Sequence, residues 1–329
     1  MKIYLIGSGM AASAFISSAR WLQQRNDEFE SLEIETLARG ADLNSIAPAP
    51  DDLLIIANPH ALHAPAIAAA DNAGFQWIIC EKPVAISKEQ LSQLTQIKAQ
   101  VFVCHGYRVQ WGPRLIKSYI ESGELGELYA IEGHYWQSSA AQRHINPNSP
   151  SKGWKDDTKL SGGADVLFDL VPHWLDLVCY LMGDAPAYIN VNCYRNDPKS
   201  FRDSHVQVNC DFLGGKHSIG SVSKMAHGFG NELQVRALGS HALASWNFER
   251  PDEITVAKGH DQKVIKRTER TIGSGMPSFH SLGWLEGYVE ILSQTLSAIK
   301  GRPYRSLPTL TESTKIMTRL FETMEKETL

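Results

Sequence analysis

Residues 1–24, MKIYLIGSGMAASAFISSARWLQQ, decide the first half of the fold. Lys2 to Ile6 is a short β-rich run, and a helical stretch follows the glycines to about Gln24. Between them lies Gly7-Ser8-Gly9-Met10-Ala11-Ala12, which fits the pattern G-x-G-x-x-A in its required place between a strand and a helix. The stretch predicts a strand-turn-helix unit that binds a dinucleotide. The alternative is a glycine-rich turn that binds nothing.

The small residues of this loop have distinct expected roles. Gly7 permits the tight turn, Gly9 lets the backbone approach a pyrophosphate, and Ala12 keeps the helix close to the strand. Met10 stands at the helix N-terminus, where amide groups and the helix dipole attract negative charge. We therefore expect Gly7, Gly9, Met10 and Ala12 to form the phosphate site.

Strand and helix patterns alternate as far as about residue 122. Further strands are expected at 32–37, 52–57, 77–80 and 101–105, with helices between them. This alternation predicts a parallel doubly wound (Rossmann) sheet, which binds ligands outside the carboxyl ends of its strands.

Lys82 stands at such a strand end, in Glu81-Lys82-Pro83. An ammonium group there could stabilise negative charge developing on a substrate oxygen. The alternative is a surface salt bridge with Glu81.

The end of the second strand bears on the choice of cofactor. NAD sites usually place an acid there to bind the ribose hydroxyls, whereas an arginine suits the 2′-phosphate of NADP. The sequence has Ala38-Arg39-Gly40, so Arg39 favours NADP over NAD. Asp42 could still serve NAD, and Arg39 could also be a solvated turn residue.

The pattern changes from about residue 128. Alternating runs at 187–194 and 206–212 are followed by shorter β candidates at 217–225, 232–238, 243–248, 253–257 and 263–268. Short connections between them predict a large, open, mostly antiparallel sheet in an α/β domain. We expect a Rossmann domain over residues 1–122 and a substrate-binding and oligomerisation domain over 123–329. Two helices, at about 280–300 and 310–326, close the chain.

Residues 162–176, GGADVLFDLVPHWLD, hold the main catalytic candidates. Asp169 and His173 are four apart, so on a helix they share a face. Pro172 is tolerated in a first turn but kinks a helix interior, so we expect a turn or a bend near Asp169. The alternative is a buried histidine with its hydrogen bonds satisfied and Asp169 as a cap.

Composition excludes several classes of function. The net charge of −4 and the lack of a basic cluster argue against a nucleic-acid surface. The N-terminal apolar run is too short for a signal peptide, and polar residues interrupt the longest apolar stretch, so no membrane segment is expected. The five cysteines are odd in number and widely spaced, which predicts no metal site and a reducing, cytoplasmic location.

With these residues in view, the chain resembles the glucose–fructose oxidoreductase/inositol dehydrogenase (Gfo/Idh/MocA) family over nearly its whole length. The motifs concerned are Gly7-Ser8-Gly9, Asn58-Pro59 with His63, Cys80-Glu81-Lys82-Pro83, Lys152-Gly153-Trp154-Lys155, Gly162-Gly163-Ala164 with Asp169, His173 and Asp176, Trp246 with Glu249-Arg250-Pro251, and His280 with Glu286-Gly287-Tyr288. Ala12 and Ala164 replace glycines of the family pattern, and Lys155 replaces a frequent arginine.

The resemblance implies oxidation of a secondary alcohol on a sugar, sugar derivative or cyclitol, with hydride transfer to a nicotinamide. It implies that His173 takes the hydroxyl proton, Asp169 orients it or stabilises its charge, and Lys82 polarises the oxygen. Lys82, Asp169 and His173 would converge on the substrate, with Arg108 as a further contact.

The resemblance also implies a wider cofactor site. That site would add Asn58, Pro59, His63, Glu81, Lys82 and Trp154 to the glycine loop and Arg39, although Trp154 could instead be a packing residue. The Lys82-Pro83 bond is expected to be cis, and a homodimer or homotetramer is expected to form through the second sheet. The alternative function is a catalytically silent regulator that senses a cofactor or sugar on the same fold.

Overall fold

The computed structural model describes residues 1–25, 29–38, 40–146, 148, 153–197, 200–268 and 282–327. The chain forms two compact units. The first unit joins Met1–Val109 to Glu269–Thr314, and the second joins Gln110–Thr268 to Lys315–Leu329. This division differs from the predicted one, because the chain returns to the first unit after the second sheet.

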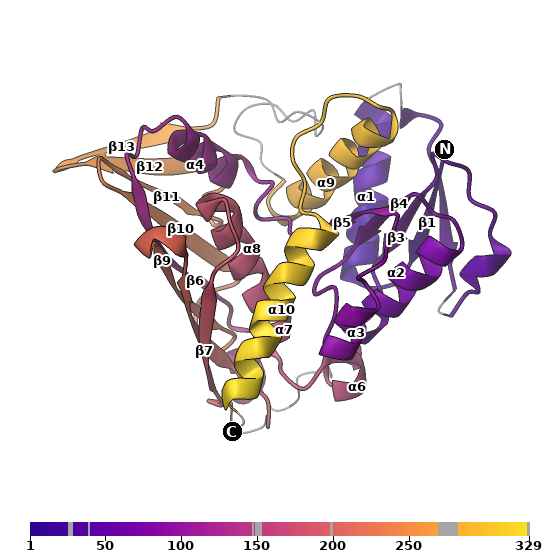
Figure 1. The fold of residues 1–329 in the computed structure, drawn as a ribbon, viewed down its shortest axis with the longest axis horizontal. Coiled ribbons are helices and arrows are strands. Elements are labelled where there is room, and N and C mark those ends of the chain that lie inside the picture. The colour runs from indigo at the N-terminus through magenta and orange to yellow at the C-terminus, as the bar shows by residue number, and fades with distance from the viewer. Residues whose placement is uncertain are drawn as a thin grey trace. The chain divides into compact units, whose positions relative to one another are not determined.

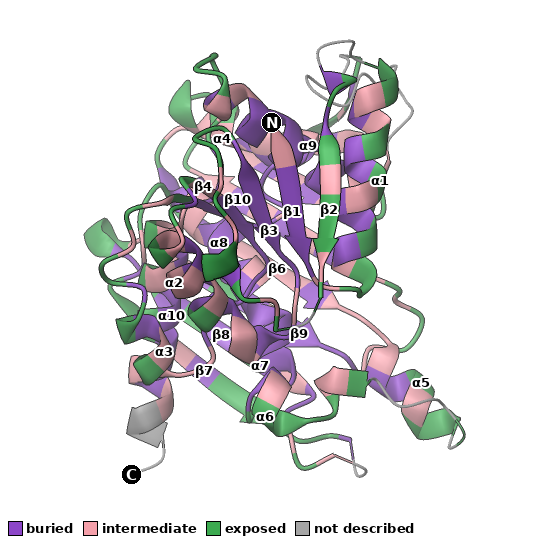
Figure 2. Ribbon diagram, turned by 90° about the vertical axis from the view of Figure 1, so that its right-hand side faces the viewer, coloured by how far each residue is buried: buried purple, intermediate pink, exposed green. Residues whose placement is uncertain are grey.

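The first unit contains a five-stranded parallel sheet, of which Figure 1 labels β1, β3, β4 and β5. Its strand order is β2-β1-β3-β4-β5. The strands are β1 (Lys2–Ile6), β2 (Glu33–Leu37), β3 (Leu53–Ile56), β4 (Trp77–Cys80) and β5 (Gln100–Val103). All four residues of β3, Leu-Leu-Ile-Ile, are buried, as expected for a central strand of a parallel sheet. Figure 2 shows β1 and β3 buried along most of their length and β2 largely exposed. The predicted Rossmann sheet is confirmed.

Helices complete the first unit. They are α1 (Met10–Arg25), α2 (His63–Asn72), α3 (Lys88–Ser92) and α9 (Trp284–Ile299), with short 3₁₀ turns at η2 (Leu43–Ser45) and η3 (His60–Leu62). Helix α9 contacts α1, and the rings of Phe15 and Tyr288 meet edge to face at 5.0 Å. A helix late in the chain therefore completes the core around the first strand.

The second unit contains an eight-stranded sheet with the order β13-β12-β11-β10-β6-β9-β8-β7. Its strands are β6 (Leu128–Trp136), β7 (Tyr188–Tyr194), β8 (His205–Asp211), β9 (His217–Ser223), β10 (Glu232–Gly239), β11 (Leu243–Asn247), β12 (Glu253–Lys258) and β13 (Asp261–Lys266). Only the pair β6–β9 is parallel. The predicted large, mostly antiparallel sheet is confirmed, and β6 is a strand that the sequence did not single out.

Several helices belong to the second unit. They are α4 (Trp111–Glu121), α5 (Ser139–Ile145), α6 (Thr158–Ser161), α7 (Val166–Asp169) and α8 (Val171–Met182), with 3₁₀ turns at η4 (Gly153–Lys155) and η5 (Leu213–Gly215). The last helix, α10 (Leu310–Glu327), begins in the first unit and continues in the second. Among the described residues, none of the helices has the length and apolar character needed to span a membrane.

Helix α8 lies against β6 and β9 through one large side chain, Trp174. A Cβ atom placed on Gly220 would lie 2.2 Å from Nε1 of Trp174, and one on Gly133 would lie 2.0 Å from the carbonyl oxygen of Gln234 and 3.0 Å from Cη2 of Trp174. The indole therefore occupies space that two strand glycines leave open. This contact sets the distance between α8 and the sheet.

Candidate active site

The glycine loop has the geometry of a phosphate site. Gly7 has φ of +131°, and a Cβ atom there would lie 2.2 Å from the carbonyl oxygen of Ala57. A Cβ atom on Gly9, by contrast, would meet nothing within 4 Å, so the space beside it is open. Ala12 is buried near the start of α1, and Met10 begins the helix with an exposed side chain. These features fit the close approach of a pyrophosphate to the helix N-terminus.

The end of β3 offers a further polar atom. Oδ1 of Asn58 is buried and has no hydrogen-bond partner among the described residues. A buried amide oxygen without a donor is costly, so it is a plausible acceptor for a bound ligand. The residues present therefore fit a dinucleotide at the ends of β1 and β3.

His63 connects the loops that follow β3 and β4. Its Nδ1 lies 2.7 Å from the carbonyl oxygen of Pro83, and its Nε2 lies 2.8 Å from that of Asn58. Burial lowers the pKa of His63. Because a neutral imidazole carries a single N–H, it donates to one of the two carbonyl groups at a time. His63 thus links the backbone after β3 to the backbone after β4, and Pro59 is the residue before η3.

Glu81 and Lys82 follow β4, and both side chains are buried. Glu81 accepts a hydrogen bond from the Tyr288 hydroxyl at 2.9 Å and another from the backbone amide of Lys82 at 3.2 Å. The alternative of a surface salt bridge is wrong, because neither group is at the surface. The Lys82-Pro83 bond is cis, as predicted.

Arg108 is buried in the first unit and has a carboxylate partner there. Its Nη2 lies 3.0 Å from Oε1 of Glu312 and 3.2 Å from Oε2. Glu312 also accepts hydrogen bonds from the backbone and hydroxyl of Thr309, both at 2.8 Å. Burial alone would raise the pKa of Glu312, but these partners lower it. Arg108 therefore anchors the start of α10, and its contact with substrate stays a prediction.

In the second unit the predicted break beside Asp169 is confirmed. Helix α7 ends at Asp169, Leu170 lies between the helices, and α8 starts at Val171 with Pro172 in its first turn. Pro172 has no N–H to donate, which suits a first turn but not a helix interior. His173 follows in the same turn, half-buried, and its ring meets Tyr135 edge to face at 6.1 Å.

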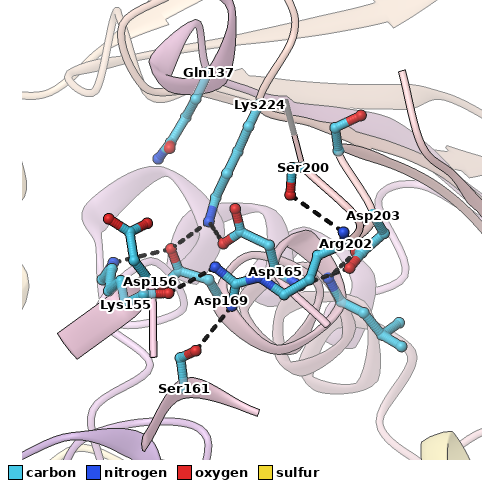
Figure 3. A network of polar contacts seen from close by, with 12 residues as sticks. Gln137, Lys155, Asp156, Ser161, Asp165, Asp169, Ser200, Arg202, Asp203 and Lys224 are labelled. Atoms are coloured by element: carbon cyan, nitrogen blue, oxygen red, sulfur yellow. Dashed lines mark hydrogen bonds and ion pairs between the residues drawn. The ribbon is translucent and has the colours of Figure 1, made fainter. Parts of the chain in front are cut away.

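Asp169 belongs to a compact group of charges, shown in Figure 3. Its Oδ2 atom lies 3.0 Å from Nζ of Lys155 and 2.8 Å from Nζ of Lys224. Lys224 also lies 2.5 Å from Oδ1 of Asp165, and its side chain is only 2% exposed. Two ammonium groups therefore share one oxygen of the predicted catalytic carboxylate.

Asp203 and Arg202 form hydrogen bonds with the segments that carry Asp165 and Lys155. Asp203 accepts hydrogen bonds from the amides of Asp165 at 2.6 Å and Leu167 at 2.7 Å, so it caps the start of α7. Burial raises the pKa of Asp203. Arg202 donates to the Ser161 hydroxyl at 2.8 Å and to the carbonyl oxygen of Lys155 at 2.6 Å. The position of Lys155 thus depends on Arg202.

Sequence reasoning missed Lys224, Asp165 and Asp203. Lys224 lies 55 residues from Asp169 and 59 from Asp165, and no local pattern connects them. Lys155 was noted in the sequence without a defined contact. Trp154 is half-buried, with its ring 5.8 Å from the Lys155 ammonium, so its contact with cofactor stays a prediction.

The predicted residues are divided between the two units. Lys82 lies in the first unit, whereas Asp169 and His173 lie in the second, so convergence of the three stays a prediction. Arg39, Lys152 and His280 fall outside the described residues. Asp42 is exposed and caps η2 by accepting from the Asn44 amide at 3.0 Å. Within the described ranges, no cluster of three or more His, Cys, Asp or Glu side chains is arranged to hold a metal.

Comparison with known proteins supports the likeness of fold and sequence. Residues 114–257 match the GFO/IDH/MocA C-terminal domain. The chain is 29% identical to levoglucosan dehydrogenase of Pseudarthrobacter phenanthrenivorans over 71% of its own length, and the match spans 65% of that relative. A solved structure titled levoglucosan dehydrogenase in complex with NADH and levoglucosan has a TM-score of 0.82 at 24% identity, covering 99% of this chain and 98% of that one.

A second structure shares the fold at lower identity. An inositol dehydrogenase homologue from Azotobacter vinelandii, solved with NAD⁺, has a TM-score of 0.80 at 16% identity, and 99% of this chain and 95% of that one are covered. The likeness to the GFO/IDH/MocA C-terminal domain thus covers part of the second unit, and the likeness of fold extends over nearly the whole chain.

Proposed function

We propose that this protein is an NAD(P)-dependent dehydrogenase. It transfers a hydride between a secondary alcohol of a sugar, sugar derivative or cyclitol and a nicotinamide cofactor. The observation that carries the proposal is the buried Asp169 carboxylate, held by Lys155 and Lys224 four residues before His173. The open glycine loop and the names of the relatives, levoglucosan dehydrogenase among them, support the same reading.

In this proposal the chain supplies the proton chemistry and the electrostatics. His173 accepts the proton of the substrate hydroxyl, because imidazole is the side chain suited to exchanging protons near neutral pH. Asp169 stabilises the imidazolium that results, and Lys82 stabilises charge developing on the substrate oxygen. When bound, the nicotinamide supplies the hydride acceptor or donor.

A spectrophotometric assay tests the proposed function. The panel contains levoglucosan, glucose 6-phosphate, myo-inositol and other polyols, each with NAD and with NADP. We expect turnover of at least one cyclic polyol. Tight binding of a cofactor without hydride transfer to or from any member would contradict the dehydrogenase and favour the silent regulator. The full set of Lys82, Asp169 and His173 favours the enzyme, because a binding module does not need it.

For the cofactor, we propose NADP on the basis of Arg39, with NAD as the alternative that the complexes of the structural neighbours support. Arg39→Asp is expected to change the ratio of Kd for NADP to Kd for NAD by at least about tenfold in favour of NAD, because the aspartate would repel the 2′-phosphate and could bind ribose hydroxyls. Titration of both cofactors measures this ratio. Lys98→Asp, an exposed charge reversal in the same unit, is the control. An unchanged ratio would show that Arg39 does not contact the phosphate.

We also propose a homodimer or homotetramer formed through the second sheet. On its exposed face lie Tyr188, Tyr194 and Ile219, which are 44%, 41% and 51% exposed. Ile219→Asp should lower the molecular mass measured by sedimentation equilibrium, because a buried unpaired charge weakens an interface. Leu213→Asp, in the turn between β8 and β9, is the control. A wild-type monomer would contradict the proposal.

A further inference from the structure

Lys224 occupies an unusual position for a lysine. It directly follows β9, its side chain is 2% exposed, and its ammonium contacts two carboxylates, those of Asp165 and Asp169. Burial by itself would lower the pKa of Lys224, but the charges of Asp169 and Asp165 outweigh that effect and raise it. The lysine is therefore held in its charged form inside the second unit.

The charges around Asp169 come from several elements. Lys155 contacts it from η4 and Lys224 from the end of β9, and Asp165, the residue before α7, contacts the same ammonium of Lys224; His173 follows in the first turn of α8. The side chain of Lys155 is 34% exposed, so solvent screens its charge more than that of Lys224. Lys224 is thus the dominant positive neighbour.

The contacts of Lys224 favour a role behind the carboxylates over a direct contact with substrate. Its ammonium donates to Asp165 and Asp169, and almost none of its surface is open. Asp165 is fixed in turn, because Asp203 binds its backbone amide. The pair formed by Lys224 and Asp165 is therefore an anchored support behind the Asp169 carboxylate.

We propose that Lys224 is a positioning residue that keeps Asp169 ionised and fixes its carboxylate beside His173, and that Asp165 balances the charge of this lysine. The effect of Lys224 on turnover rests on the proposed dehydrogenase function. Its effect on the ionisation of Asp169 does not depend on that function.

The first test measures the carboxyl group directly. Carbon-13 NMR of protein labelled at the aspartate carboxyl carbons follows Asp169 through a pH titration, and Asp169→Asn identifies its signal. We expect Lys224→Met to raise the pKa of Asp169 by about one to three units, the usual effect of one close charge. Lys224→Arg should retain most of the wild-type value, because the charge remains.

Asp165 makes the test specific for charge. Adding Asp165→Asn to Lys224→Met removes the competing carboxylate, so the pKa of Asp169 should move back towards the wild-type value. Asp165→Asn alone should lower it, because the ammonium then serves a single carboxylate. This single variant keeps the proposal testable if Lys224→Met does not fold. The proposal would be overturned if the pKa of Asp169 were unchanged in Lys224→Met and Asp165→Asn. It would also be overturned if that pKa were higher in the double variant than in Lys224→Met.

The second test measures how Lys224 affects the pH dependence of turnover. In the direction of alcohol oxidation, the acid limb of kcat/KM against pH should move to higher pH in Lys224→Met, because loss of a buried cation favours protonation of the neighbouring carboxylates and imidazole. Lys266→Met, which removes an exposed lysine paired with Glu253 in the same sheet, should leave the limb in place. If Lys224→Met changed the pKa of Asp169 but left the acid limb of kcat/KM in place, the positioning role would be overturned. Absence of hydride transfer in the wild type would contradict the proposed function alone, since the NMR titration needs no substrate.

Discussion

Replacement of His173 by alanine is expected to lower kcat for alcohol oxidation by about two to four orders of magnitude, the usual contribution of a positioned acid–base group. His173 is half-buried in the first turn of α8, four residues after Asp169, and its replacement removes the proposed acceptor of the hydroxyl proton. Cofactor affinity should change little, because the proposed cofactor contacts do not include His173. Steady-state kinetics and cofactor titration measure both quantities.

The control for this prediction is His241→Ala, which removes an exposed histidine between β10 and β11 in the same unit. Its kcat should match the wild type, and both variants should keep the wild-type circular dichroism spectrum. Wild-type rates in His173→Ala would remove this imidazole from the mechanism. A large loss in the control would show that the assay reports general damage to the second unit.

The second large effect is expected at Gly7. Gly7→Ala would place a methyl group 2.2 Å from the Ala57 carbonyl oxygen at a φ of +131°, a conformation that residues with a side chain rarely adopt. Overpacking and backbone strain each cost about 1–3 kcal/mol, so we expect a loss of about 2–6 kcal/mol in the free energy of unfolding. Urea denaturation without cofactor measures this loss.

Gly9→Ala is the matched variant, because a methyl group there would meet nothing within 4 Å of the protein. Its stability should equal that of the wild type, while its affinity for the dinucleotide should fall by at least about tenfold, since the methyl group occupies the path of the pyrophosphate. Unchanged affinity would mean that the phosphates do not approach Gly9. Equal stability of Gly7→Ala and the wild type would contradict the geometry of the turn.

The parts of the fold that depend on short stretches of sequence were predictable. The strands of the first sheet are buried apolar runs such as Leu53–Ile56, and the glycine loop has its own local geometry. The break between α7 and α8 follows from Pro172, because the lack of an N–H is a property of that residue alone.

Other features depend on partners that are distant in the sequence. Strand β6 lies in the middle of its sheet, between β10 and β9, and its burial pattern does not alternate strictly. Helix α9 packs against α1, which lies near the other end of the chain. A single lysine at the end of β9 gives no local sign that its charge will reach Asp169.

The contact of Trp174 with Gly133 and Gly220 has a consequence for engineering new substrate preferences. The indole belongs to the residue after His173, so a side chain added at Gly220 would meet the indole and displace the helix that carries the imidazole, whereas one added at Gly133 would first meet the carbonyl oxygen of Gln234. Mutant libraries aimed at other ring sizes or stereoisomers should keep these three residues constant. The varied positions should lie in the surface loops, where substitutions can change the substrate-binding site without moving His173.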